Sequence, residues 1–163
     1  MFKHILIPID LQEEDERPRT LALHKAIELC RVYDAQLHVL TVVPDVGMPI
    51  VGYYFPTETE DKIVHESERF LHELVNQHIP DDIDVQHLVA QGTVYKRILR
   101  MAEKIRADLI IMPAQQKKLQ DFLIGSNASR VVRYAQCSVL VVRADFDDHF
   151  ICVSNVKNGV NCK

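Results

Sequence analysis

The chain has 163 residues, of which 47% are hydrophobic and 26% are charged, which is enough for one globular domain with a buried core. Its formal net charge of −4 gives no electrostatic reason to expect nucleic acid or an anionic membrane surface as a partner. No apolar run approaches the roughly 20 residues that a membrane span needs, and the N-terminus does not resemble a signal peptide. We therefore expect a cytoplasmic protein.

Five short runs rich in Val, Ile and Leu predict strands, because most are apolar without alternation, as in strands buried on both faces of a parallel sheet. These runs cover residues 5–9, 37–43, 85–90, 109–112 and 139–142. Helical periodicity fills the intervals, over residues 18–33, 58–78, 94–106 and 126–135. The alternation of strands and helices predicts a single doubly wound α/β domain with a five-stranded parallel sheet and helices on both faces.

Two of these helices carry more detailed predictions. The second is expected to bury Ile63, Phe70, Leu74 and Val75 together. Thr93 is expected to cap the third helix at its start.

Two segments lie outside this regular pattern. Residues 44–59 contain three prolines, two glycines and three aromatic residues, and loops of this length are often lids or partner surfaces. Residues 144–163 follow the last predicted strand. This tail is expected to be mobile, with an added edge strand over residues 150–153 as the alternative.

Cysteines and histidines show no metal-binding or redox pattern. No C-x-x-C pair occurs among Cys30, Cys137, Cys152 and Cys162, so we expect buried or tolerated thiols. The eight histidines are scattered. Two of them, at positions 65 and 72, share a helix face and are expected to be solvated rather than to ligate a metal.

Three loops are predicted to meet at one edge of the sheet, because ligands of open parallel sheets bind beyond the carboxyl ends of the strands. These loops contain residues 8–10, 41–43 and 113–125. The carboxylate of Asp10 can accept hydrogen bonds from a ribose or an amino group. The backbone at Val42 can pair with a base edge. The helix start at Gly125-Ser126-Asn127 offers free N–H groups and a positive dipole end to an anion.

Each of these elements also has a plain structural explanation. An aspartate after a strand often forms a turn or caps a helix. The Gly-Ser-Asn sequence is also an ordinary helix start, and Lys117 and Lys118 suit a solvated loop. Only their occurrence at the matched ends of three strands favours a nucleotide cleft, so both interpretations stay open from the residues alone.

Four stretches of the sequence resemble the universal stress protein family over residues 1 to about 143. They are "KHILIPID", "LHVLTVVP", "QGTVYKRILRMAEKIRADLIIMPA" and "LIGSNASRVVRYAQCSVLVVR". The resemblance implies a Rossmann-like sheet of order 3-2-1-4-5 and a homodimer joined along the last strand, Ser138–Val142. The apolar "SVLVV" edge is an independent reason to expect pairing with a second copy.

The nucleotide-binding branch of that family carries G-x2-G-x9-G-[ST] after the fourth strand. In this chain its first two glycines fall on Pro113 and Gln116, the last pair on Gly125-Ser126, and the second gap is eight residues rather than nine. Proline removes one backbone N–H and glutamine adds a side chain, whereas Lys117 or Lys118 can replace amide donors by charge.

The resemblance implies a site for ATP, or for AMP or ADP, possibly with magnesium. Asp10 and Val42 match the adenosine-side positions of the family, and Pro8 matches its strand-end proline. The candidate ligand-binding residues are Pro8, Asp10, Val42, Met112, Ala114, Gln116, Lys117, Gly125, Ser126 and Asn127.

No motif for catalysis is present: the chain has no G-x-S-x-G elbow, no Walker lysine motif and no HExxH. The sequence therefore predicts a homodimeric regulator that binds an adenine nucleotide without dedicated chemistry and acts on an unidentified protein partner. Two alternatives stay open. One is a nucleotide-independent dimeric scaffold with a degenerate site. The other is a slow ATP hydrolase, and Asp10 can hold a metal ion.

Overall fold

The computed structural model describes residues 1–43, 57–114 and 125–143, and the side chains of residues 57–61 lie outside the description. Strands and helices alternate strictly within these ranges. The elements are β1 (His4–Ile9), α1 (Glu16–Tyr33), β2 (Gln36–Val43), α2 (Thr57–His78), β3 (Val85–Gln91), α3 (Val94–Ile105), β4 (Leu109–Pro113), α4 (Ser126–Tyr134) and β5 (Ser138–Val142). Neighbouring strands pair in parallel in the order β3-β2-β1-β4-β5, which confirms the expected fold and strand order.

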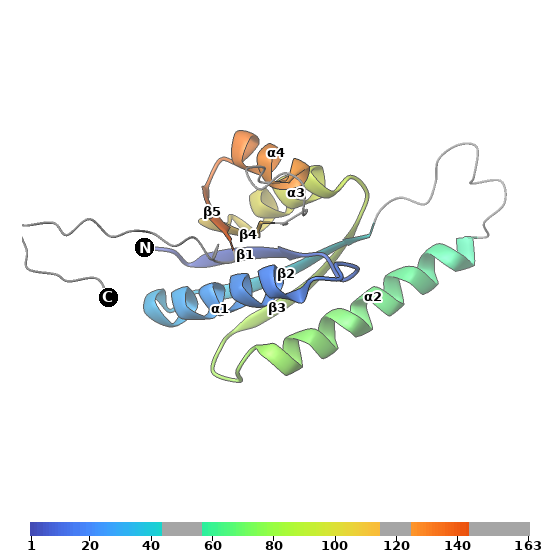
Figure 1. Cartoon of the computed structure of the whole chain (residues 1–163), viewed down its shortest axis with the longest axis horizontal. Coiled ribbons are helices and arrows are strands. Elements are labelled where there is room, and N and C mark those ends of the chain that lie inside the picture. Colours follow the sequence, from blue (N-terminus) through green and yellow to red (C-terminus); the bar gives the residue numbers. More distant parts are fainter. Residues whose placement is uncertain (44–56, 115–124, 144–163) are drawn as a thin grey trace, which may run out of the picture.

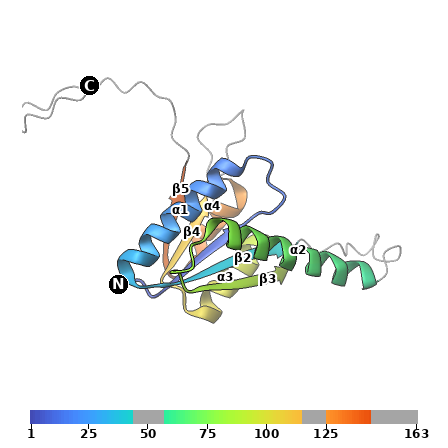
Figure 2. The same cartoon turned by 90° about the horizontal axis from the view of Figure 1, so that it is seen from below.

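The sheet separates two apolar layers. Helices α1 and α2 cover one face, and α3 and α4 cover the other (Figures 1 and 2). Odd-numbered residues of β1 such as Ile5 and Ile7 point to the α1–α2 layer, whereas Leu6 points to the α3–α4 layer. All three are fully buried, because side chains alternate between the faces of a strand and this strand is covered on both.

Helix α1 begins two residues before its predicted start. Asp15 is the N-cap, and its carboxylate accepts a hydrogen bond from the N–H of Arg17 at 3.1 Å. Pro18 therefore lies in the first turn, where a missing N–H costs nothing. The helix ends at Asp34, which has a left-handed backbone with φ of 53°.

Helix α2 corrects one prediction about the core. Phe70 was expected in the buried stripe, but its side chain is 49% exposed, and Leu71 is fully buried in its place. Leu74 and Val75 are buried as expected, and positions 71, 74 and 75 form one face at helical spacing. The ring of Phe70 lies outside that face and packs under the guanidinium of Arg69, with 5.2 Å between the guanidinium carbon and the ring centroid.

Helix α3 corrects a second detail. Thr93 occupies the N-cap position with an extended backbone, but its side chain makes no capping hydrogen bond. Spacing in the sequence identified the cap position but not the direction of the hydroxyl. The segment 44–56 of the expected lid and the tail 144–163 lie outside the described residues.

Candidate functional site

A cavity opens at the carboxyl ends of β1, β2 and β4, where the three predicted loops meet. Residues of the sheet, of α2, of α3 and of the start of α4 form its walls. They are Pro8, Ile9, Asp10, Leu11, Gln12, Thr41, Val42, Val43, Ile63, Ser67, Val94, Ile98, Met112, Pro113, Gly125, Asn127 and Ala128.

The structure brings six of the ten candidate residues to this cavity: Pro8, Asp10, Val42, Met112, Gly125 and Asn127. Ala114 is buried, and Ser126 is exposed at the start of α4; neither is among the lining residues. Gln116 and Lys117 lie outside the described residues.

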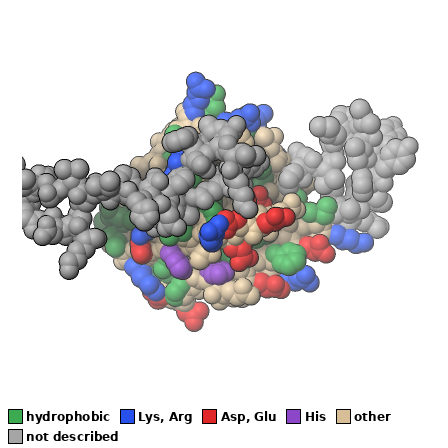
Figure 3. Space-filling model, in the orientation of Figure 1, with side chains coloured by type: hydrophobic (Ala, Val, Ile, Leu, Met, Phe, Trp, Pro, Cys, Tyr) green, Lys and Arg blue, Asp and Glu red, His purple; other side chains and the backbone are tan. Residues whose placement is uncertain are grey.

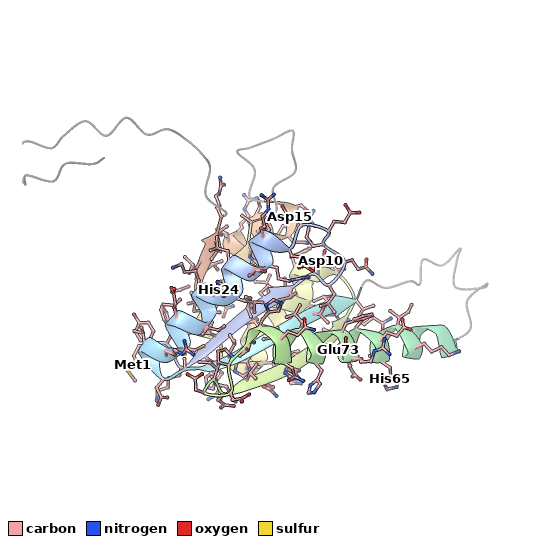
Figure 4. The ribbon with its side chains drawn as sticks, turned by 60° about the horizontal axis from the view of Figure 1, so that its bottom comes forward. Met1, Asp10, Asp15, His24, His65 and Glu73 are labelled. Carbon is pink, nitrogen blue, oxygen red and sulfur yellow. The ribbon has the colours of Figure 1, made fainter. Side chains whose placement is uncertain are left out.

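Asp10 lies directly after β1, in the loop that leads to α1 (Figure 4). One of its carboxylate oxygens, Oδ1, accepts a hydrogen bond from the N–H of Gln12 at 2.9 Å. The side chain therefore does form a local turn, as the plain structural explanation expects. It is also exposed and lines the cavity, so the carboxylate remains accessible to a hydroxyl group or a cation.

The wall made by β2 is apolar and firmly held. The hydroxyl of Thr41 donates to the carbonyl of Ile9 at 3.1 Å, which ties the ends of β1 and β2 together. Val42 points to the α3–α4 layer and packs against the cluster that contains Ile98. An apolar wall of this kind suits a flat heterocycle.

Helix α2 contributes two lining residues that the sequence analysis did not identify, Ile63 and Ser67. The hydroxyl of Ser67 donates to the carbonyl of Ile63 at 2.8 Å, so this hydroxyl is engaged within the helix. Their spacing of four residues, on the helix that follows the long loop, is the signal that could have placed them on one face.

The start of α4 faces the cavity with Gly125 as its N-cap. Gly125 has φ of 86° and ψ of 148°, a conformation that is essentially restricted to glycine. No side chain caps this end among the described residues. The first backbone N–H groups of a helix have no intrahelical partner, so those at the start of α4 are suited to bind an anion.

The sequence model of the Universal stress protein family matches residues 1–143. The chain belongs to this family.

Relatives and solved structures agree with this assignment. The chain is 28% identical to Universal stress protein G of Shigella flexneri over 146 residues, which is 88% of this chain and 100% of that protein. It resembles the structure of the hypothetical protein MJ0577 with a TM-score of 0.74 at 23% identity, covering 90% and 99% of the two chains. Less similar structures include a universal stress protein in complex with cAMP (TM-score 0.60, 17% identity, 87% and 97% covered) and one from Archaeoglobus fulgidus in complex with dAMP (0.60, 18%, 85% and 96%).

Two backbone positions at the end of β4 in this universal stress protein offer no free N–H to an anion. Pro113 has no N–H. The N–H of Ala114 donates to the carbonyl of Val142 at 2.8 Å and so belongs to the sheet. The backbone N–H groups at the start of α4, which faces the cavity, are therefore the described donors best suited to an anion there.

The described cysteines are free thiols, Cys30 buried and Cys137 half-buried, in line with the expected buried or tolerated thiols. Burial raises the pKa of Cys30 to about 11 and also raises the pKa of Cys137, so neither thiol ionises readily near neutral pH. Cys152 and Cys162 lie outside the described residues. The described part of the chain holds no group of three His, Cys, Asp or Glu side chains arranged to bind a metal, and no helix in it is long and apolar enough to cross a membrane.

Proposed function

We propose that this universal stress protein is a non-catalytic cytoplasmic regulator that binds an adenine nucleotide in the cavity at the carboxyl ends of β1, β2 and β4. The observation that carries the proposal is the placement of two complementary groups on one cavity. The carboxylate of Asp10 can accept hydrogen bonds from a sugar, and the uncapped start of α4 at Gly125 can donate to a phosphate.

In the proposed complex the nucleotide lies in one direction along the cavity. The base lies against Val42 and Ile98, the ribose lies near Asp10, and the phosphates lie at Gly125 and Asn127. Solved family members in complex with cAMP and dAMP support an adenine nucleotide as the class of ligand. The amides at the start of α4 do not distinguish AMP, ADP and ATP, so all three are candidates. A magnesium ion beside Asp10 is expected only with ADP or ATP, which have longer phosphate chains.

We further propose that the protein forms a homodimer through β5. Strand β5 is one of the two edge strands of the sheet, and the side chain of Leu140 on it is 37% exposed. Tyr134 and Val132 of the neighbouring helix α4 are also exposed. An apolar edge strand beside exposed large side chains is a surface that a second copy can cover.

One observation favours a second candidate function, a nucleotide-independent dimeric scaffold. Pro113 and Ala114 offer no free N–H to a phosphate, as expected of a site that has lost its ligand. Binding and scaffold functions differ in whether the purified protein carries or takes up a nucleotide.

Native mass spectrometry of the purified full chain, before and after addition of AMP or ATP, tests the proposal. We expect one nucleotide per chain in the native protein and a marked loss of it in Asp10→Ala. Asp81→Ala is the matched control, because Asp81 is exposed in the turn after α2 and does not line the cavity. Absence of any bound or added nucleotide on the native protein would favour the scaffold. Conversion of ATP to ADP that disappears in Asp10→Ala would instead favour a slow hydrolase.

A further inference from the structure

Two histidines face each other on the side of the sheet that α1 and α2 cover. His72 lies on α2 and His87 lies on β3, fifteen residues further along the chain. Their Nδ1 atoms are 3.4 Å apart, and the two rings are inclined at 76° with 5.1 Å between the centroids. Both residues are exposed, and histidine side chains reach the surface in the lower half of Figure 3.

The distance between these nitrogens is that of two ligands on one tetrahedral metal ion. Zinc–nitrogen bonds of about 2.0–2.1 Å at tetrahedral angles place the two nitrogens roughly 3.3–3.4 Å apart. In this structure the two nitrogens form a hydrogen bond that is long beside the distance of about 3.0 Å at which N–H donors centre.

The environment keeps the nitrogens available. His72 and His87 are both exposed, so water and a metal ion can reach their imidazole rings. Neutral imidazole is the form that binds zinc, copper and nickel.

A second histidine pair provides a contrast within the same protein. His4 Nδ1 and His38 Nε2 are 3.2 Å apart, but His38 is only 3% exposed and its other nitrogen contacts Gln86 Oε1 at 2.8 Å. His38 is thus buried and engaged on both ring nitrogens, while His4 is half-buried. His72 and His87 are instead both exposed.

We propose that His72 and His87 together bind a divalent transition-metal ion of the zinc class through their facing Nδ1 atoms, with water in the remaining positions. No third His, Cys, Asp or Glu of the described chain completes a metal-binding group, so the site is open and its metal exchangeable. A bound ion would fasten α2 to β3 next to the edge of the sheet. This site is separate from the nucleotide cavity and does not depend on it.

Zinc titration of the full chain by isothermal calorimetry, after removal of metal with EDTA, tests the site. We expect His72→Gln and His87→Gln each to lose one zinc equivalent relative to the native protein. The measured quantity is the difference in zinc equivalents between each variant and the native protein, all as full chains. This is necessary because His149, Cys152 and Cys162 can bind metal themselves and are present in every variant. His65→Gln is the matched control, since His65 is exposed on the same helix and contacts Glu68 instead of a second histidine.

Thermal unfolding gives an independent measurement. A ligand that binds only the folded state raises Tm, so zinc should raise Tm more in the native protein and in His65→Gln than in either site variant. The proposal is overturned if the native protein and both site variants bind the same number of zinc equivalents. It is also overturned if the native protein shows no saturable binding below about 100 µM zinc, a weak affinity on the usual scale.

Discussion

The backbone N–H of Ala114 donates to the carbonyl of Val142 at 2.8 Å, which extends the pairing of β4 with β5 beyond Pro113. The N–H of Ala114, the first residue after β4, is therefore engaged in the sheet and is not free to bind a phosphate. The anion-binding capacity of the described cavity then rests on the start of α4.

Replacement of Gly125 by alanine should weaken AMP binding at least about tenfold. At φ of 86° and ψ of 148°, a side chain costs on the order of 1–3 kcal/mol and turns the first amides of α4 away from the cavity. Isothermal calorimetry of AMP with the two proteins measures the effect. Ser129→Ala, at an exposed position of the same helix, should bind as the native chain does. Equal affinity in Gly125→Ala would show that the phosphate does not lie at this helix start.

Leu71→Ala should lower the free energy of unfolding by about 2–5 kcal/mol, because it removes a fully buried side chain and leaves a cavity between α2 and the sheet. Phe70→Ala should cost roughly 1 kcal/mol or less, since this larger side chain is half exposed. Urea unfolding of both variants makes the comparison. A greater loss of unfolding free energy in Phe70→Ala than in Leu71→Ala would contradict this packing of α2, because it would mean that Phe70 and not Leu71 faces the core.

Leu140→Arg should convert the proposed dimer to a monomer while leaving the secondary structure intact. Arginine at this exposed position of β5 puts a charge into the proposed apolar interface. Light scattering after size-exclusion chromatography gives the mass, and circular dichroism gives the helix content. Val32→Arg on α1, exposed away from β5, is the control. A native protein that already runs as a monomer would refute the dimer.

Acid should destabilise the protein in part through His38. Burial lowers the pKa of His38, and the contact with Gln86 only partly offsets this effect. The unfolded chain then binds more protons than the folded chain between the lowered pKa and the ordinary value of about 6.5. The stability linked to His38 is complete above about pH 6.5 and declines as pH falls through the folded-state pKa.

Urea unfolding between about pH 5 and pH 7.5 tests this linkage. His38→Gln should show a shallower loss of stability on the acid side than the native protein. Some loss should remain, because the pKa of His87 is also lowered. His24→Gln, exposed on α1, should retain the native dependence. If His38→Gln loses as much stability at acid pH as the native protein does, His38 does not contribute to the pH dependence.

The strands were predictable because their burial on both faces requires continuous apolar runs, which are visible in the sequence without knowledge of the neighbouring strands. The predicted run 37–43 differs from β2 (Gln36–Val43) by one residue. The choice between Phe70 and Leu71 was not predictable in the same way. Both are apolar, and only the docking of α2 on the sheet decides which one faces the core.

The strand-end side of the cavity was predictable because parallel strands must bring their carboxyl ends together, which places Asp10, Val42 and Gly125 near one another. Ile63 and Ser67 were missed because their position depends on how α2 crosses the sheet. The contact between His72 and His87 was missed for the same reason. It also depends on the register of β2 against β3, which sets His87 opposite Val39.

Nucleotide binding in the described cavity is tested most directly by titrating AMP, and separately ATP, into isotope-labelled full chain and recording amide chemical shifts. We expect saturable shifts that concentrate at Val42, Gly125 and Asn127, three positions far apart in the sequence that share this cavity. No shifts up to about 1 mM nucleotide, a very weak affinity on the usual scale, or shifts confined to other surfaces, would contradict the proposed function.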